Sequence, residues 1–223
     1  MPTTSITDLW TTEVGSSMWN MFQPGISDHD YCTIRQFPTK LLLSGYKNPG
    51  TWPSQIKNNE LNGVPIDQNY LEVEHLVGQL LKGNINAIWY VMSPIIIKDH
   101  IYLHELREII MSNPSKLPFH SIRGMALSQK RDEIKRPALT QEKGYRTAIR
   151  TLLFGQQLLQ DWKFDFNVKE LYDIENITLE EVNYHIKQLE TTYQDSCLPD
   201  NINKYPFRQF LYKVRCNDLL DIY

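Results

Sequence analysis

The chain has 223 residues, 41% of them hydrophobic, and a formal net charge of −3 at pH 7. This length is enough for one large domain or two small ones with a proper core, and the apolar and aromatic content excludes a disordered chain. The charge balance excludes a global basic field, so any contact with nucleic acid has to come from a local patch.

The cysteines Cys32, Cys197 and Cys216 are scattered and form no CxxC pair. They indicate free thiols in a reducing compartment and not a disulfide framework or a zinc site. The N-terminus lacks a basic segment followed by an apolar one, and no run approaches the ~18 apolar residues of a membrane span. We expect a cytoplasmic protein with no membrane partner, and the sequence does not indicate an oligomeric state.

The first half of the chain is predicted to mix strands and helices. TTEVGSS, at 11–17, predicts a short strand that enters a turn and then a helix near Ser16 or Ser17. DYCTIRQF, at 30–37, is β-branched and aromatic enough to be a strand. Glycine, proline and asparagine then predict a loop or ragged hairpin from Leu41 onward.

The next strand is predicted at GVPID, 63–67, followed by a helix within 70–83 that ends at Gly83. The second half is predicted to be helical. The expected helices lie at 104–113 before Pro114, at 116–136, from an N-cap at Thr140 to Leu159, from a capping box at Thr178, and from Lys204. The sequence thus predicts an α+β fold, with a mixed sheet of four or five strands and flanking helices in 1–113 and a helical domain in 114–223.

Two aspartates stand out as candidate metal ligands. In an extended strand, side chains two residues apart point to the same face, so Asp28 and Asp30 would present two carboxylates side by side. Two such anions repel each other unless a cation lies between them, and hard oxygen ligands suit Mg²⁺ or Mn²⁺. Gly15 and Ser16 could hold phosphate oxygens, and Asp67 could add a third carboxylate from a neighbouring strand.

Each of these pieces is weak alone, because most Asp-x-Asp pairs are solvated turns. Their order is more specific: Gly15-Ser16, then SDHDY, then Asp67 and a helix that ends LKGNIN. This order resembles the DNA polymerase beta-like nucleotidyltransferase superfamily, and more closely its predicted nucleotidyltransferase subgroup, which is associated with RNA repair. The pattern there is approximately G-S-R-x-Y-G, S-D-x-D-Y, and an Asp before a helix ending L-K-G-N-P-N.

The resemblance extends into the second half, where EKGYRTAIRTLL is similar to a family helix, and covers the chain from about Glu13 to about Asn203. It implies a Mg²⁺-dependent nucleotidyltransferase with two Mg²⁺ or Mn²⁺ ions, which moves a nucleoside monophosphate from an NTP such as ATP to an acceptor hydroxyl. The catalytic and metal-binding residues that it implies are Asp28, Asp30 and Asp67. The nucleotide-binding residues that it implies are Gly15, Ser16, Ser27, Lys143 and Arg150. The chain departs from the pattern at Ser17, Asn20, Ile85 and Thr147, where the family has Arg, Gly, Pro and His.

The favoured acceptor is the end of an RNA or tRNA, and a protein hydroxyl or a small alcohol stays open. A non-catalytic nucleotide- or RNA-binding module of the same fold is the rival, and metal-dependent phosphoester hydrolysis would use the same acids. Lys143, Arg146 and Arg150 share a helix face that could either contact phosphates or be an ordinary solvated surface.

Five other residues are given less weight. His100 and His104 could clamp a metal from one helix face, but no third ligand is indicated. Cys32 is expected to be a buried core thiol, and His29 is expected to face away from the metals. Glu72 is kept as a substitute for Asp67.

Overall fold

The computed structural model describes residues 5–23, 27–46, 51–52, 60–61, 64–134, 138–167 and 177–220. The chain divides into two compact units. The first comprises Met1–Leu81, Asn86–Ser112 and Asn203–Tyr223, and the second comprises Lys82–Ile85 and Asn113–Ile202. The segment after Asn203, which we grouped with the helical part, therefore belongs to the first unit.

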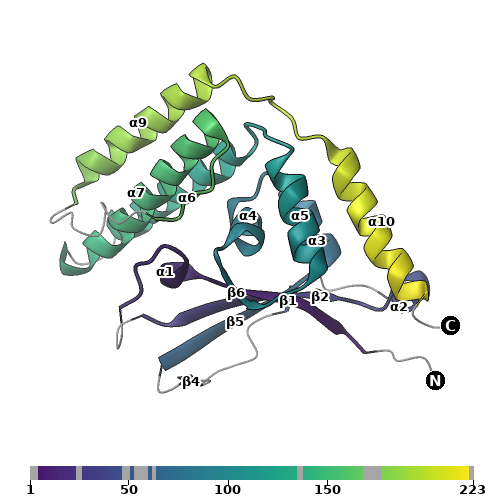
Figure 1. Ribbon diagram of the computed structural model, residues 1–223. Helices are drawn as coiled ribbons and strands as arrows, with labels where there is room; N and C mark the ends of the chain where they lie inside the picture. Colours follow the sequence, from purple (N-terminus) through teal and green to yellow (C-terminus); the bar gives the residue numbers. More distant parts are fainter. Residues whose placement is uncertain are drawn as a thin grey trace. The chain divides into compact units, whose positions relative to one another are not determined.

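The first unit is built on a mixed sheet with the strand order β3-β5-β2-β1-β6, and β4 pairs with β5 (Figure 1). The strands are β1 (Thr7–Val14), β2 (His29–Gln36), β3 (Thr51–Trp52), β4 (Glu60–Leu61), β5 (Val64–Glu72) and β6 (Ile95–Lys98). β2 and β5 are parallel, whereas β1 is antiparallel to both β2 and β6. The predicted fold class, a mixed sheet with flanking helices followed by a helical region, is confirmed.

Helices cover one face of this sheet, where α3, α4 and α5 lie on the same side of the strands (Figure 1). The helices of this part of the chain are α1 (Gly15–Met18), α2 (Thr39–Leu43), α3 (Val73–Leu80), α4 (Ile85–Met92), α5 (Ile101–Met111) and α10 (Lys204–Leu220). α10 packs against α2, α3 and α5. The largest fully buried side chains of this unit include Trp10, Trp19, Leu76, Leu103, Phe207 and Phe210.

The junction of β5 and α3 differs from the prediction. We expected the helix to include Tyr70, but Tyr70 and Leu71 continue the strand because they pair with Thr33 and Ile34 of β2. The helix begins only after Glu72, whose side chain accepts a hydrogen bond from the backbone at the helix start. A buried parallel pairing partner thus overrides the helical spacing of the apolar residues that follow.

The second unit contains α6 (Pro118–Ile134), α7 (Ala138–Asp161) and α9 (Leu179–Asp195). The capping box at Thr178 is confirmed, since its side chain and that of Glu181 each bond the other's backbone N–H. The N-cap prediction at Thr140 is wrong, because Thr140 lies inside α7, which begins at Ala138. In the described part of the chain, no helix is long and apolar enough to cross a membrane.

Gly155 of α7 faces side chains of both α6 and α9. A Cβ atom there would be 2.8 Å from Ile122 Cγ2 and 2.9 Å from Leu189 Cδ1. We expect Gly155→Ala to lower the free energy of unfolding by about 1–3 kcal/mol from overpacking, more than alanine's gain of about 1 kcal/mol in helix propensity. Gly124 of α6 has open space around its Cα, so Gly124→Ala should instead stabilise. Urea unfolding of both variants tests this, and stabilisation by both would contradict it.

Candidate functional site

Two of the three predicted acids are direct neighbours across parallel strands. Asp30 of β2 is paired in register with Asp67 of β5. Asp28 lies one residue ahead of β2, at the spacing that places it on the same side as Asp30. Asp30 is half-buried, while Asp28 and Asp67 are exposed. The start of β2 and the neighbouring strand β5 therefore present three carboxylates, which we call the carboxylate row, and Asp30 is its most buried member.

Gly15 brings its backbone directly against this row. It follows Val14, the last residue of β1, which is paired with Asp30. Its φ is +64°, and a Cβ atom there would lie 1.8 Å from Asp30 Oδ2. Both the backbone conformation and the lack of space require glycine. Gly15, which is predicted to bind phosphate, therefore adjoins Asp30, which is predicted to bind metal, although the two residues are separated in the sequence.

The two serines that are predicted to bind nucleotide, Ser16 and Ser27, differ in their hydrogen bonds. Ser16 Oγ is buried and has no hydrogen-bond partner within the described part of the chain. An unsatisfied buried hydroxyl costs about 1–3 kcal/mol, so its position is suited to a polar ligand. Ser27 Oγ instead accepts a hydrogen bond from the Gln23 backbone N–H at 3.1 Å. Ser27 therefore closes the turn that leads into Asp28.

Tyr90 of α4 lies close to the acids. Burial raises the pKa of the Tyr90 hydroxyl, and the nearby acidic groups of Cys32, Asp30 and Asp67 raise this pKa further. At neutral pH Tyr90 is therefore a neutral hydroxyl near both carboxylates. The backbone carbonyl of Tyr90 accepts a hydrogen bond from Thr12 Oγ1 at 2.8 Å, which holds α4 against β1. We missed this residue because no element was predicted between 84 and 103.

His29 faces away from the carboxylate row, as predicted. Its Nδ1 lies 2.5 Å from Glu13 Oε1, and its ring stacks between those of Phe22 and Tyr31. Glu13 and Tyr31 are paired in register on neighbouring strands. These contacts hold the start of β2 in place on the face of the sheet opposite to the acids.

The metal prediction has no completed ligand set in the structure. Within 5–23, 27–46, 64–134, 138–167 and 177–220, no three His, Cys, Asp or Glu side chains lie close enough together to hold a metal ion. The donor type nevertheless suits a hard cation, since the row offers carboxylate oxygens and the Ser16 hydroxyl.

The two histidines on α5 have structural partners. His104 Nε2 lies 2.8 Å from Asp99 Oδ1, and His100 Nδ1 accepts a hydrogen bond from the Tyr102 backbone N–H at 3.2 Å. The second contact makes His100 the N-cap of α5. These contacts account for both imidazoles without a metal.

The basic residues Lys143, Arg146 and Arg150 lie on α7 in the second unit, whereas the acids lie in the first. Arg146 and Arg150 are half-buried, which is unlike a fully solvated basic face. The side chain of Lys143 lies outside the described residues. The nucleotide contacts expected of Lys143 and Arg150 stay predictions.

The structure of the chain is distantly similar to that of a nucleotidyltransferase-like protein. That protein, from Exiguobacterium sibiricum, has a solved structure with 14% sequence identity, and the alignment covers 94% of this chain and 74% of that one with a TM-score of 0.31. No protein-family model matches the sequence, and no curated protein matches it either. A similarity with so low a TM-score says nothing about the function of this chain, so a function can be inferred only from its residues.

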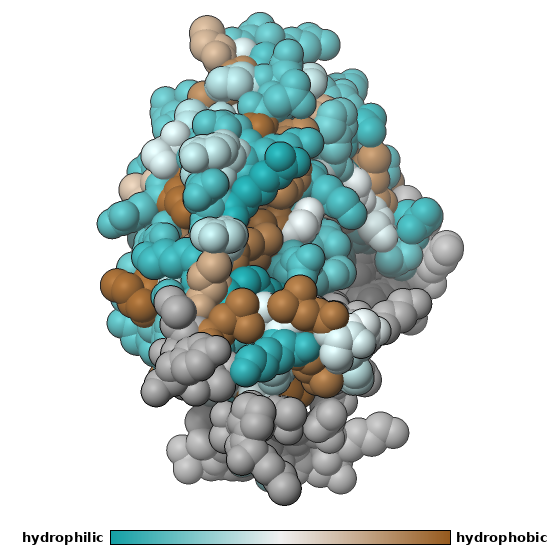
Figure 2. All heavy atoms as spheres, turned by 90° about the vertical axis from the view of Figure 1, so that its right-hand side faces the viewer, coloured by the Kyte–Doolittle hydropathy of each residue, from teal (hydrophilic) through white to brown (hydrophobic). Residues whose placement is uncertain are grey.

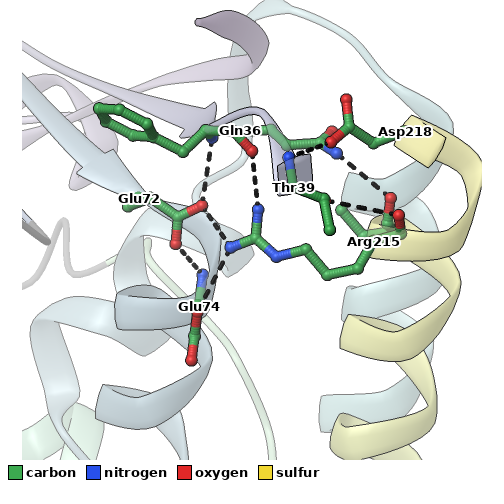
Figure 3. A network of polar contacts seen from close by, with 8 residues as sticks. Gln36, Thr39, Glu72, Glu74, Arg215 and Asp218 are labelled. Atoms are coloured by element: carbon green, nitrogen blue, oxygen red, sulfur yellow. Dashed lines mark hydrogen bonds and ion pairs between the residues drawn. The ribbon is translucent and has the colours of Figure 1, made fainter. Parts of the chain in front are cut away.

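Glu72 is not a substitute for Asp67. Its carboxylate is fully buried and accepts hydrogen bonds from the backbone N–H groups of Phe37 and Glu74 (Figure 3). Its Oε1 also lies 2.7 Å from Arg215 Nη2 of α10. All of these contacts join parts of the first unit to one another, so Glu72 is a structural acid. Cys32 is likewise structural, because it is 1% exposed, and burial raises its pKa.

Proposed function

We propose that this chain is a Mg²⁺-dependent nucleotidyltransferase that moves a nucleoside monophosphate from an NTP to an acceptor hydroxyl and releases pyrophosphate. The end of an RNA or tRNA is the favoured acceptor. A nucleoside triphosphate is an anion that needs both backbone or hydroxyl donors and cations held by carboxylates. The chain offers both kinds of group next to each other.

The observation that carries this proposal is the contact between Gly15 and Asp30. The gap there is too small for a Cβ atom, so the backbone that would cradle phosphates directly adjoins a carboxylate that would hold a cation. Asp67 supports the proposal from the next strand, in register with Asp30. The buried hydroxyl of Ser16 supports it as well, because no described group satisfies that hydroxyl.

Each residue has a defined role in the proposed reaction. Asp28 and Asp30 would hold both ions, and Asp67 would complete the ligands of one ion and help to remove the proton of the acceptor hydroxyl. Gly15 and Ser16 would bind the β and γ phosphates. Two Mg²⁺ or Mn²⁺ ions, when bound, would neutralise the charge that develops on the transferred phosphate. Ser27 would order the turn before Asp28, and Lys143 and Arg150 would add phosphate contacts from α7.

A non-catalytic binding module of the same fold is the second candidate. Against it stands the in-register pairing of Asp30 with Asp67, because a protein that never holds a cation there has no physical need to place acids side by side. Metal-dependent phosphoester hydrolysis would use the same acids. The products distinguish it from transfer, since transfer releases pyrophosphate and attaches the label to the acceptor.

The direct test incubates the protein with Mg²⁺, a total RNA pool and each of the four NTPs labelled at the α phosphate. We expect the wild type to attach label to RNA and to release pyrophosphate. The double variant Asp28→Asn and Asp30→Asn should lose this activity by a factor of about 10³ or more, because the groups that stabilise charge in the transition state are neutralised.

Asp132→Asn is the matched control, since Asp132 is an exposed acid on α6 in the other unit. It should retain wild-type activity. Circular dichroism confirms that the double variant folds. Equal label transfer by the wild type and the double variant would refute the proposed roles of the acids. Absence of label from RNA, protein and small molecules with every NTP would support the binding-module alternative.

A further inference from the structure

The exposed side of α10 carries two tyrosines that the proposed site does not use. The inner side of this helix packs through Phe207, Phe210 and Val214, all buried. On the outer side Tyr205 is 66% exposed and Tyr212 is 69% exposed. Both rings are therefore accessible to a partner. Figure 2 views the molecule from the side on which α10 lies in Figure 1, and hydrophilic side chains cover much of it.

Two cations lie beside these tyrosines without a counter-charge. Lys213 and Arg215 of the same helix are paired with carboxylates of α5 and of the β5–α3 junction. Lys204 and Arg208 are exposed and form no ion pair with any carboxylate in the described part of the chain. In a chain with a net charge of −3, they make a local positive patch.

The spacing places these side chains in one stripe. Tyr205, Arg208 and Tyr212 are separated by three and then four residues, so they follow one another along a single helix face. At 1.5 Å of rise per residue the two tyrosines are about 10 Å apart along the helix, with the guanidinium between them. Lys204 extends the stripe at its first turn. We call these four residues the α10 face.

We infer that the α10 face binds single-stranded nucleic acid. Exposed tyrosine rings stack on unpaired bases of any sequence, and the cations between them contact the phosphates that link those bases. Duplexes hide their bases in the stack, so they would use only the cations. An acidic protein segment would also use the cations and would leave both rings without a specific role. The inference goes beyond the proposed reaction and does not need the carboxylate row to be catalytic.

The test measures fluorescence anisotropy with a labelled 12-nucleotide RNA of mixed sequence, without NTP or metal. We expect the double variant Tyr205→Ala and Tyr212→Ala to bind the strand at least about 30-fold more weakly, since two bases lose the rings on which they stack. The double variant Lys204→Gln and Arg208→Gln should reduce the slope of log K against log salt by about 1.4.

Two matched variants keep the result specific. Tyr184→Ala removes a tyrosine of similar exposure, 57%, from α9 in the other unit and should leave RNA binding unchanged. Asp132→Asn, which also lies outside this face, should retain RNA binding too, and because the assay contains no NTP or metal its outcome does not depend on catalysis. The inference is overturned if the wild type does not bind the RNA, if the two-tyrosine variant binds it equally well, or if a duplex or a polyglutamate peptide binds as tightly as the single strand.

Discussion

Replacing Arg215 with methionine is expected to lower the free energy of unfolding of the first unit by about 3–5 kcal/mol. The reason is the carboxylate that the substitution leaves behind. Glu72 is fully buried and Arg215 Nη2 lies 2.7 Å from it, while Arg215 Nη1 donates to the Phe37 carbonyl (Figure 3). Without the guanidinium, a buried negative charge keeps only backbone N–H partners. Urea unfolding followed by tryptophan fluorescence measures the loss.

The same helix provides the control for this prediction. Lys213 forms an ion pair of similar length with Glu105, 2.6 Å, but its side chain is 51% exposed. Lys213→Met should therefore cost much less stability than Arg215→Met, because solvent screens an exposed ion pair. The double variant Glu72→Met and Arg215→Met should recover part of the loss, because no buried charge remains. Equal costs for Arg215→Met and Lys213→Met would show that burial of the pair contributes nothing.

The second large effect is expected at Gly15. Gly15→Ala should reduce nucleotidyl transfer by about 100-fold or more, because the new Cβ atom has to displace the Asp30 carboxylate, and shifts of about 1 Å in a reacting site have consequences of this size. The positive φ adds a backbone penalty on the order of 1 kcal/mol. Label transfer from NTP measures the activity, and urea unfolding measures the stability.

Gly45 distinguishes the effect of the clash with Asp30 from the backbone penalty of a positive φ. Its φ is +90°, yet a Cβ atom there meets nothing within 4 Å. Gly45→Ala therefore carries a backbone penalty without a clash, and it should leave transfer unchanged. If Gly15→Ala loses no more activity than Gly45→Ala, the contact with Asp30 is not important for the reaction.

Local rules were sufficient for several parts of the fold. The strand and the short helix on either side of the Val14–Gly15 junction follow from β-branched residues and a glycine, although the predicted turn between them is absent, since α1 begins directly after β1. The helix start at Thr178 follows from a reciprocal capping box. For Asp30 and Asp67, the sequence predicted only that Asp67 would lie on a neighbouring strand. The register that makes them direct neighbours depends on the parallel pairing of β2 and β5.

The features that escaped prediction depend on partners far along the chain. Glu72 gives no sign in its own neighbourhood that it is buried, since its cation comes from Arg215, at a sequence separation of 143 residues. Tyr90 belongs to a helix whose apolar residues, IWYVM, show no clear period. The hydroxyl of Tyr90 lies near the acids only because the strands and the hydrogen bond from Thr12 position α4 beside them.

The place of α10 in the first unit also affects the order in which the protein is made. The ribosome delivers this helix after every residue of the second unit, so the nascent chain carries β1, β2 and β5 while their last covering helix is still missing. Until Phe207, Phe210 and Arg215 emerge, the apolar surface that they cover stays accessible and Glu72 lacks its cation. The second unit can therefore fold before the first, which becomes whole only after α10 has left the ribosome.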